Sequence, residues 1–265
     1  MLKNIPQFAH ADQLRAFEEG AAAIRAVELA SSPIQGRFDY DHMKAIHRYL
    51  FQDVYVWAGE ERVAPSDQMV KVGPNVVDFA VGDPNAPDVA YGYYPAPFIA
   101  DAAAHQYDLL MKENLLQGLP PAQFVDRLAE HWGEINTIHS FREGNTRSQF
   151  VFFSQLAEHA GYRLHPEPFR QGGELREEFI AARFYNQATG QRSRLAEVLA
   201  RAVEPIAKDR AHQQPAAVSP GRSVADGTRT SVRARIEDAV AGHRTAADGD
   251  VDVSGRARDD KGPRR

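Results

Sequence analysis

The sequence contains no cysteine. This absence excludes disulfide bonds, thiolate nucleophiles and cysteine-based metal sites, although it does not decide the redox compartment. Long apolar runs are lacking as well: no segment approaches the length of a membrane span, and the start of the chain has no signal-peptide stretch. We therefore expect a soluble, cytoplasmic protein without a membrane partner; translocation into another cell stays open.

Excess positive charge is lacking too. The 31 Lys and Arg residues are outnumbered by 36 Asp and Glu, and the net charge is −5, so we expect no nucleic-acid partner. The fingerprints GxxxxGK[ST], GxGxxG and HExxH do not occur. What remains is an ordinary globular composition, 43% hydrophobic and 25% charged over 265 residues, which suffices for one domain with a sizeable core.

Apolar residues spaced three and four apart predict a mainly helical domain. The expected helices cover residues 11–30, 40–53, 98–112, 121–138 and 145–160, with two more beginning near residues 174 and 193. Between residues 57 and 97, Gly, Pro and Val replace this periodicity and include two short strand-like pieces. After residue 206 large apolar side chains almost vanish. Such a segment cannot offset its ordering entropy, so we expect a disordered tail, with one short helix near residues 230–241.

The most informative stretch is HSFREGNTR, which runs from His139 to Arg147. Unpaired N–H groups and the dipole at a helix start favour a phosphate, and Gly144 lets an anion approach the backbone. Arg147 is a forked donor for phosphate oxygens, and Glu143 is a carboxylate suited to Mg²⁺. His139 can accept a proton near neutral pH. Each residue alone has a structural explanation, but in this order they predict a phosphate-transfer site.

This stretch resembles the Fic signature HxFx(D/E)GNxR. Residues 38–60 (FDYDHMKAIHRYLFQDVYVWAGE) and 131–162 also look like bacterial Fic proteins. The resemblance implies an all-α fold, a Fic-type helical bundle with a short β-hairpin flap. Under this interpretation residues 1–36 are an N-terminal helical extension, residues 37–205 the Fic domain and residues 206–265 the disordered tail.

The resemblance also implies an activity, the transfer of AMP from ATP to a Ser, Thr or Tyr hydroxyl of a target protein. His139 would be the base, and Glu143 would hold the Mg²⁺ that bridges the phosphates. The phosphate-binding residues would be Gly144, Asn145, Thr146 and Arg147.

Two further groups are implied by their position in the family pattern. Tyr185 and Asn186 would belong to the adenine pocket. The flap would dock the target through Tyr91, Gly92 and Tyr93, within residues 88–95, although simple packing of a hairpin explains these tyrosines equally well.

Three residues depart from the family pattern. Ser140 replaces the usual proline at a variable position, from which little follows, and the other two bear on the reaction. Thr146 stands where glycine is frequent, and Phe150 stands where a second arginine usually reaches the γ-phosphate. The Doc branch, which transfers the γ-phosphate, shares both departures but lacks the Glu143 carboxylate and the full Gly-Asn pair. We therefore favour AMP transfer.

Other functions stay open. A Doc-like phosphotransferase, a user of another nucleotide and an inactive Fic-fold binding module are the alternatives. A metallohydrolase built on His131, His139 and Glu143 is disfavoured, because that spacing does not place three ligands on one helical face.

Regulation can also be examined in the sequence. Many Fic enzymes are inhibited by a glutamate in a Ser/Thr-x-x-x-Glu-Gly/Asn helix, which pairs with the second arginine. Neither Glu158 nor Glu197 is followed by Gly or Asn. Glu19 is followed by Gly20, but Arg15 occupies the position where the pattern requires Ser or Thr. We expect no strong built-in inhibition; a separate antitoxin-like inhibitor stays open.

Overall fold

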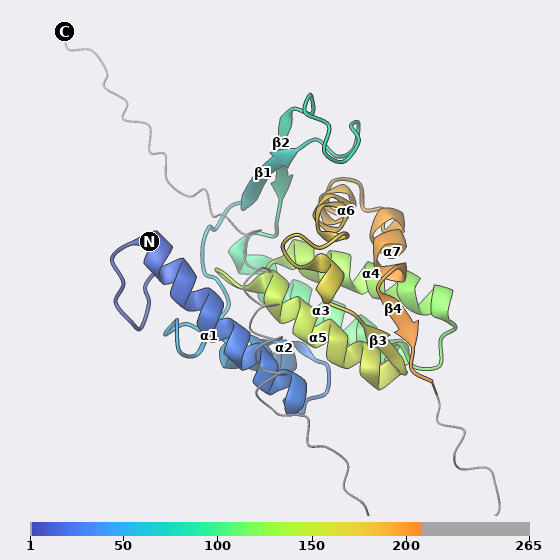
Figure 1. Cartoon of the computed structure of the whole chain (residues 1–265), viewed down its shortest axis with the longest axis horizontal. Helices are drawn as coiled ribbons and strands as arrows, with labels where there is room; N and C mark the ends of the chain where they lie inside the picture. Colours follow the sequence, from blue (N-terminus) through green and yellow to red (C-terminus); the bar gives the residue numbers. More distant parts are fainter. Residues whose placement is uncertain (1, 208–265) are drawn as a thin grey trace, which may run out of the picture.

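The computed structural model describes residues 2–207. The predicted disordered tail and its short helix therefore lie outside the described residues, apart from the tail's first two positions. Within residues 2–207 the chain forms seven α-helices, two small two-stranded antiparallel sheets and three short 3-10 turns (Figure 1). The predicted helical bundle with a β-hairpin flap is confirmed.

The helices begin and end close to the predicted residues. They are α1 (Ala11–Ser31), α2 (Tyr40–Phe51), α3 (Ile99–Lys112), α4 (Pro121–Ile138), α5 (Asn145–Ala160), α6 (Arg176–Thr189) and α7 (Ser193–Ala200). Their ends follow from local chemistry. The Asp39 carboxylate caps α2 by accepting the His42 N–H at 2.9 Å, Pro121 occupies the first turn of α4, and Gly161 ends α5 in a left-handed conformation.

The flap is the hairpin of β1 (Val70–Pro74) and β2 (Asp88–Gly92), in which Val70 lies opposite Gly92. It projects beyond α6 (Figure 1). A second two-stranded antiparallel sheet pairs β3 (Tyr162–Leu164) with β4 (Val203–Pro205), and α6 and α7 lie between these strands in the sequence. The sequence analysis missed it, because strands of three residues carry too little alternation to be recognised.

Helices α4 and α5 pack against each other at the centre of the core. Helix α2 packs on α5, with α1 against both, while α3, α6 and α7 pack on α4. The interface is filled by large rings, and Trp132, Phe124, Phe152 and Phe153 are each fully buried. Such close packing holds the two central helices rigidly, so the loop that joins them is held at both ends. None of the described helices combines the length and the apolar character that a bilayer crossing requires.

Candidate active site

His139 directly follows α4 with left-handed backbone angles, φ 50° and ψ 60°. Glycine is the usual residue in this conformation, which costs a residue with a side chain about 1–3 kcal/mol. The His139 N–H donates to the Ile135 carbonyl at 3.3 Å and closes the helix. His139 thus combines a strained backbone with a titratable side chain at the end of a central helix.

Arg62 holds this backbone in place. Its side chain is buried; Nε donates to the His139 carbonyl at 2.7 Å, and Nη2 donates to the Tyr94 carbonyl. The Arg62 N–H donates to the Ser140 carbonyl at 2.9 Å. Because the last carbonyls of a helix have no partner within it, Arg62 satisfies these groups and orients His139. The sequence analysis assigned Arg62 no role.

The loop between α4 and α5 is closed by Asn145. Its Oδ1 accepts the Phe141 N–H at 2.9 Å, and its Nδ2 donates to the Phe141 carbonyl at 2.7 Å. The side chain predicted to bind phosphate is therefore engaged within the loop. A phosphate contact from Asn145 would come from its backbone N–H at the start of α5.

Gly144, which precedes α5, has a φ of +79°, and a Cβ at this position would lie 2.3 Å from the Phe51 ring. Both the conformation and the close approach require glycine. The tight turn brings the first amides of α5 towards the mouth of the loop, where an anion can bind them.

His47 supports the loop from α2, although the sequence analysis gave it no role. Its ring stacks on Phe141 with centroids 3.8 Å apart. The Gly59 N–H donates to Nδ1 at 2.8 Å, so Nε2 carries the proton and donates to the Glu143 carbonyl at 2.9 Å. Its place on the apolar face of α2, beside Leu50, was the available signal.

Burial lowers the pKa of His47 to about 3, although the hydrogen bond to the Glu143 carbonyl opposes this shift. The imidazole thus stays neutral in the folded protein and becomes protonated in the unfolded chain below about pH 6.5. Its contribution to stability is complete above pH 6.5 and is lost as the pH falls towards 3, at about 1.4 kcal/mol per pH unit.

We therefore expect the free energy of unfolding to fall by about 2 kcal/mol between pH 6.5 and pH 5 on account of His47 alone. Urea titrations at several pH values will measure this slope. His47→Gln should lower stability at pH 7 but flatten the slope, whereas the exposed His159→Gln should leave it unchanged. An undiminished slope in His47→Gln would contradict this assignment.

Arg147 lies in the first turn of α5 and is held by two carboxylates. Its Nη2 is 3.3 Å from Glu143 Oε1 and donates to a carboxylate oxygen of Glu18, a buried residue of α1. The Tyr55 hydroxyl donates to the other Glu18 oxygen. The predicted phosphate-binding arginine is thus paired with a glutamate that the regulatory pattern did not reveal, because Leu14 stands where the pattern requires Ser or Thr and Glu19 stands where it requires Gly or Asn.

We expect Glu18→Gln to bind ATP more tightly than the wild type, although it should be less stable without nucleotide. Removing one partner of a buried ion pair costs about 3–5 kcal/mol, and phosphate oxygens would replace the lost carboxylate at Arg147. Thermal unfolding with and without ATP measures this as a larger stabilisation by ATP. The matched control is Glu28→Gln, in a surface ion pair of the same helix with Arg25. A smaller ATP effect in Glu18→Gln would mean that Glu18 positions Arg147 for binding.

Thr146 and Phe150, the two departures that bear on the reaction, lie one turn apart on α5. The Thr146 hydroxyl accepts from Nη1 of Arg183 in α6 at 3.0 Å. The Phe150 ring packs against Trp132, Phe169 and Phe179, with centroids 5.0–5.3 Å apart. Position 150 is therefore part of the aromatic core.

The three flap residues have different environments. Tyr91 is buried and stacks on Phe184 of α6 with centroids 4.3 Å apart, which packs the hairpin onto the bundle. The Gly92 carbonyl accepts from Gln187 Nε2 at 2.6 Å. The Tyr93 ring lies 4.2 Å from the His139 ring, and only 5% of His139 is exposed. The His139 imidazole is therefore packed against the residue that follows β2 of the flap.

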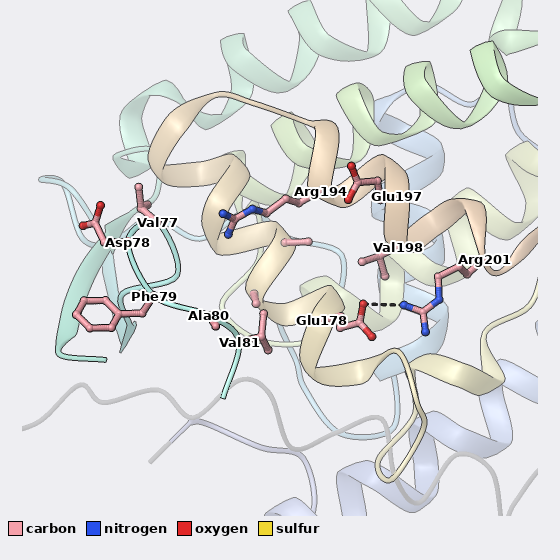
Figure 2. Close-up of a pocket in the computed structure, with 12 residues that line it drawn as sticks. Val77, Asp78, Phe79, Ala80, Val81, Glu178, Arg194, Glu197, Val198 and Arg201 are labelled. Carbon is pink, nitrogen blue, oxygen red and sulfur yellow. Dashed lines mark hydrogen bonds and ion pairs between the residues drawn. The ribbon is translucent and has the colours of Figure 1, made fainter. Parts of the chain in front are cut away.

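Tyr185 and Asn186 point in different directions, as neighbours on a helix do. Arg194 of α7 lies over the Tyr185 ring at 3.7 Å, and its Nη1 donates to the Val76 carbonyl at 2.6 Å. Arg194 also lines a cleft of about 640 Å³ between α7, the flap loop and the preceding turns of α6, which Tyr185 and Asn186 do not line (Figure 2). The Asn186 amide instead lies against Gly133 of α4, where an added Cβ would be 2.2 Å away. Of the two, Asn186 faces the helix that carries His139.

Fold and site together define a helical domain in which a histidine ends one central helix and a glycine-containing turn starts the next. A family model described as Fic/DOC family matches residues 37–157. The chain is 30% identical over 164 residues to the probable protein adenylyltransferase y4lH of Sinorhizobium fredii. The aligned segment covers 62% of this chain and 74% of y4lH. The chain belongs to the Fic/DOC family.

Other relatives agree with this assignment. Protein adenylyltransferase VbhT of Bartonella schoenbuchensis is 36% identical over 152 residues, 57% of this chain and 28% of VbhT. The crystal structure of the N-terminal FIC domain of Bep8 from Bartonella sp. 1-1C has 26% identity and a TM-score of 0.60, covering 76% of this chain and 88% of that one. The chain spans 28% and 60% of the lengths of VbhT and of the probable protein adenylyltransferase Fic from Escherichia coli.

Proposed function

We propose that this chain is a protein adenylyltransferase, which transfers AMP from ATP to a side-chain hydroxyl of a target protein. The observation that carries the proposal is the junction of α4 and α5. One short loop, closed by Asn145 and held by Arg62, connects His139 at the end of α4 to the amino end of α5. A base next to an anion-binding helix end is the arrangement that transfer of a phosphoryl-type group needs. The relatives named protein adenylyltransferases support the choice of AMP.

In this reaction the target oxygen attacks the α-phosphorus of ATP. The bond from that phosphorus to the oxygen bridging the α- and β-phosphates breaks, and pyrophosphate leaves. The hydroxyl proton passes to the His139 imidazole. The amides at the start of α5 and the Arg147 guanidinium stabilise charge on the phosphate oxygens.

Glu143 fits a Mg²⁺ site. Its Oε1 accepts the Gly144 N–H at 2.8 Å, so the carboxylate lies at the amino end of α5. Among the described residues no group of three or more acidic or histidine side chains holds a metal by itself, and Mg²⁺ commonly uses one carboxylate together with substrate phosphates. When bound, the ion would neutralise phosphate charge.

The flap, the base pocket and the partners belong to the same proposal. The edge of the hairpin that ends at Tyr93 would align the target beside His139. Asn186 would contact the adenine from the side of α6 that faces α4. Tyr185, on the opposite side of α6, would belong to the same adenine pocket. A cytoplasmic location, a toxin-like effect on the cell and a separate antitoxin-like inhibitor remain predictions. So does the division at residues 36 and 205, although α1 contributes Leu14 and Leu29 to the common core.

The test is mass spectrometry of a cell lysate incubated with purified protein and two ATP samples, one labelled in the α-phosphate and one in the γ-phosphate. We expect an AMP-sized adduct on hydroxyl side chains, carrying the α-label alone. A phosphate-sized adduct with the γ-label would establish a Doc-like phosphotransferase instead. The absence of any adduct in a lysate in which the protein binds ATP would favour a binding module.

A further inference from the structure

Arg183 of α6 contacts the first turn of α5 from outside the signature. Its Nη1 donates to Thr146 Oγ1 at 3.0 Å and to Asn136 Oδ1 at 3.1 Å. Asn136 lies in the last turns of α4, and Thr146 lies in the first turn of α5. The guanidinium therefore spans the ends of both helices that carry the signature loop.

The pairing between α5 and α6 explains this position. Residues 146 and 150 share one face of α5, and residues 179 and 183 share one face of α6, because both pairs are four apart. Thr146 meets Arg183, and Phe150 meets Phe179 with ring centroids 5.3 Å apart. The aromatic residue of α5 and the cation of α6 thus occupy neighbouring places in one layer.

Packing fixes the direction of the Arg183 side chain. The guanidinium carbon lies 4.8 Å from the centroid of the Phe179 ring, an arrangement that favours a cation. A planar group held on a ring and by two oxygens has few alternative rotamers, so the guanidinium has a defined position and orientation.

Electrostatics indicate the ligand. The amino end of α5 carries partial positive charge, and Arg183 adds a guanidinium group beside it, whereas Arg147 is paired with Glu18 and Glu143. The two oxygens that Nη1 contacts belong to the neutral side chains of Thr146 and Asn136. A ligand with several negative charges, such as a nucleoside triphosphate, is favoured there over a monophosphate or a nucleoside.

We propose that Arg183, oriented by Thr146, binds the phosphate chain of the nucleotide and supplies the positive charge that Phe150 does not. This inference rests on the proposed function. The inference also explains Thr146 and Phe150 together. The Thr146 hydroxyl holds Arg183, and the Phe150 ring completes the aromatic surface under the Arg183 guanidinium. Asn186, three residues further along α6, lies on the same side and would face the base of the same nucleotide.

The experiment is calorimetric titration of ATP, AMP and adenosine into the wild type, Arg183→Gln and Arg183→Lys. Loss of a charge-assisted contact should weaken ATP binding about tenfold to a hundredfold in Arg183→Gln, with adenosine binding unchanged. The lysine variant keeps the charge without the fork and should fall between. The matched control is Arg201→Gln, whose arginine pairs with Glu178 beside the flap cleft (Figure 2).

Thr146→Val tests the orienting contact. It should weaken ATP binding several-fold in the wild-type background and have no further effect in Arg183→Gln, because the contact is already absent there. Additive effects would separate Thr146 from Arg183 and overturn the orienting role.

Two further outcomes overturn the inference. One is ATP binding of wild-type strength in a folded Arg183→Gln; the other is an equal loss of adenosine, which would assign Arg183 to the shape of the base pocket. If the wild type binds ATP in an Arg183-dependent way but forms no AMP adduct, the proposed function fails and this inference stands. A wild type that binds no triphosphate would contradict both.

Discussion

His139→Ala should lower the rate of AMP transfer by about 10²–10⁴-fold, because the attacking hydroxyl loses its base. ATP binding should change little, since the phosphate contacts come from α5 and from arginines. Quantified adducts from labelled ATP give the rate, and calorimetry gives the affinity.

A conservative variant keeps this test independent of folding. Asparagine tolerates the left-handed backbone of position 139 but is not a base at neutral pH. His139→Asn should therefore be as inactive as His139→Ala and as stable as the wild type. The matched control is His159→Ala, an exposed histidine at the other end of α5, which should retain full activity. Substantial transfer by a folded His139→Asn would show that another group removes the proton.

Gly144→Ala should both destabilise the protein and abolish tight ATP binding. A left-handed backbone costs a residue with a side chain about 1–3 kcal/mol, and forcing a methyl group against a packed ring costs about as much again. The new Cβ would lie 2.3 Å from Phe51, so the turn must shift and carry the first amides of α5 with it. We expect a loss of about 2–5 kcal/mol in unfolding free energy, measured in urea.

Gly161→Ala separates the two causes. Gly161 has a similar φ of +88°, but nothing lies within 4 Å of the added Cβ. This variant should lose only about 1 kcal/mol and keep its affinity for ATP. If Gly144→Ala bound ATP as well as Gly161→Ala does, the turn at Gly144 would not be part of the nucleotide site.

Glu18 and Arg183 show where sequence analysis ends. Glu18 is 129 positions from the arginine that it contacts, and its neighbours do not form the expected regulatory pattern. Arg183 lies on a helix that the sequence predicted, but no local sequence pattern tells which face of that helix packs against Thr146. The sequence showed that Phe150 replaces the arginine of the family pattern. It did not show the aromatic cluster into which the Phe150 ring packs.

The sequence by itself determined the helices, the flap and the order of groups in the signature. These features depend on neighbours a few residues apart: helical periodicity, caps, and a glycine between a carboxylate and a helix start. Only the tertiary structure decided that Arg62 holds the His139 backbone across 77 positions, that Tyr93 covers the imidazole, and which carboxylate meets Arg147. Those contacts arise from the packing of whole helices, in which a small rotation changes every partner, and no local pattern in the chain encodes that rotation.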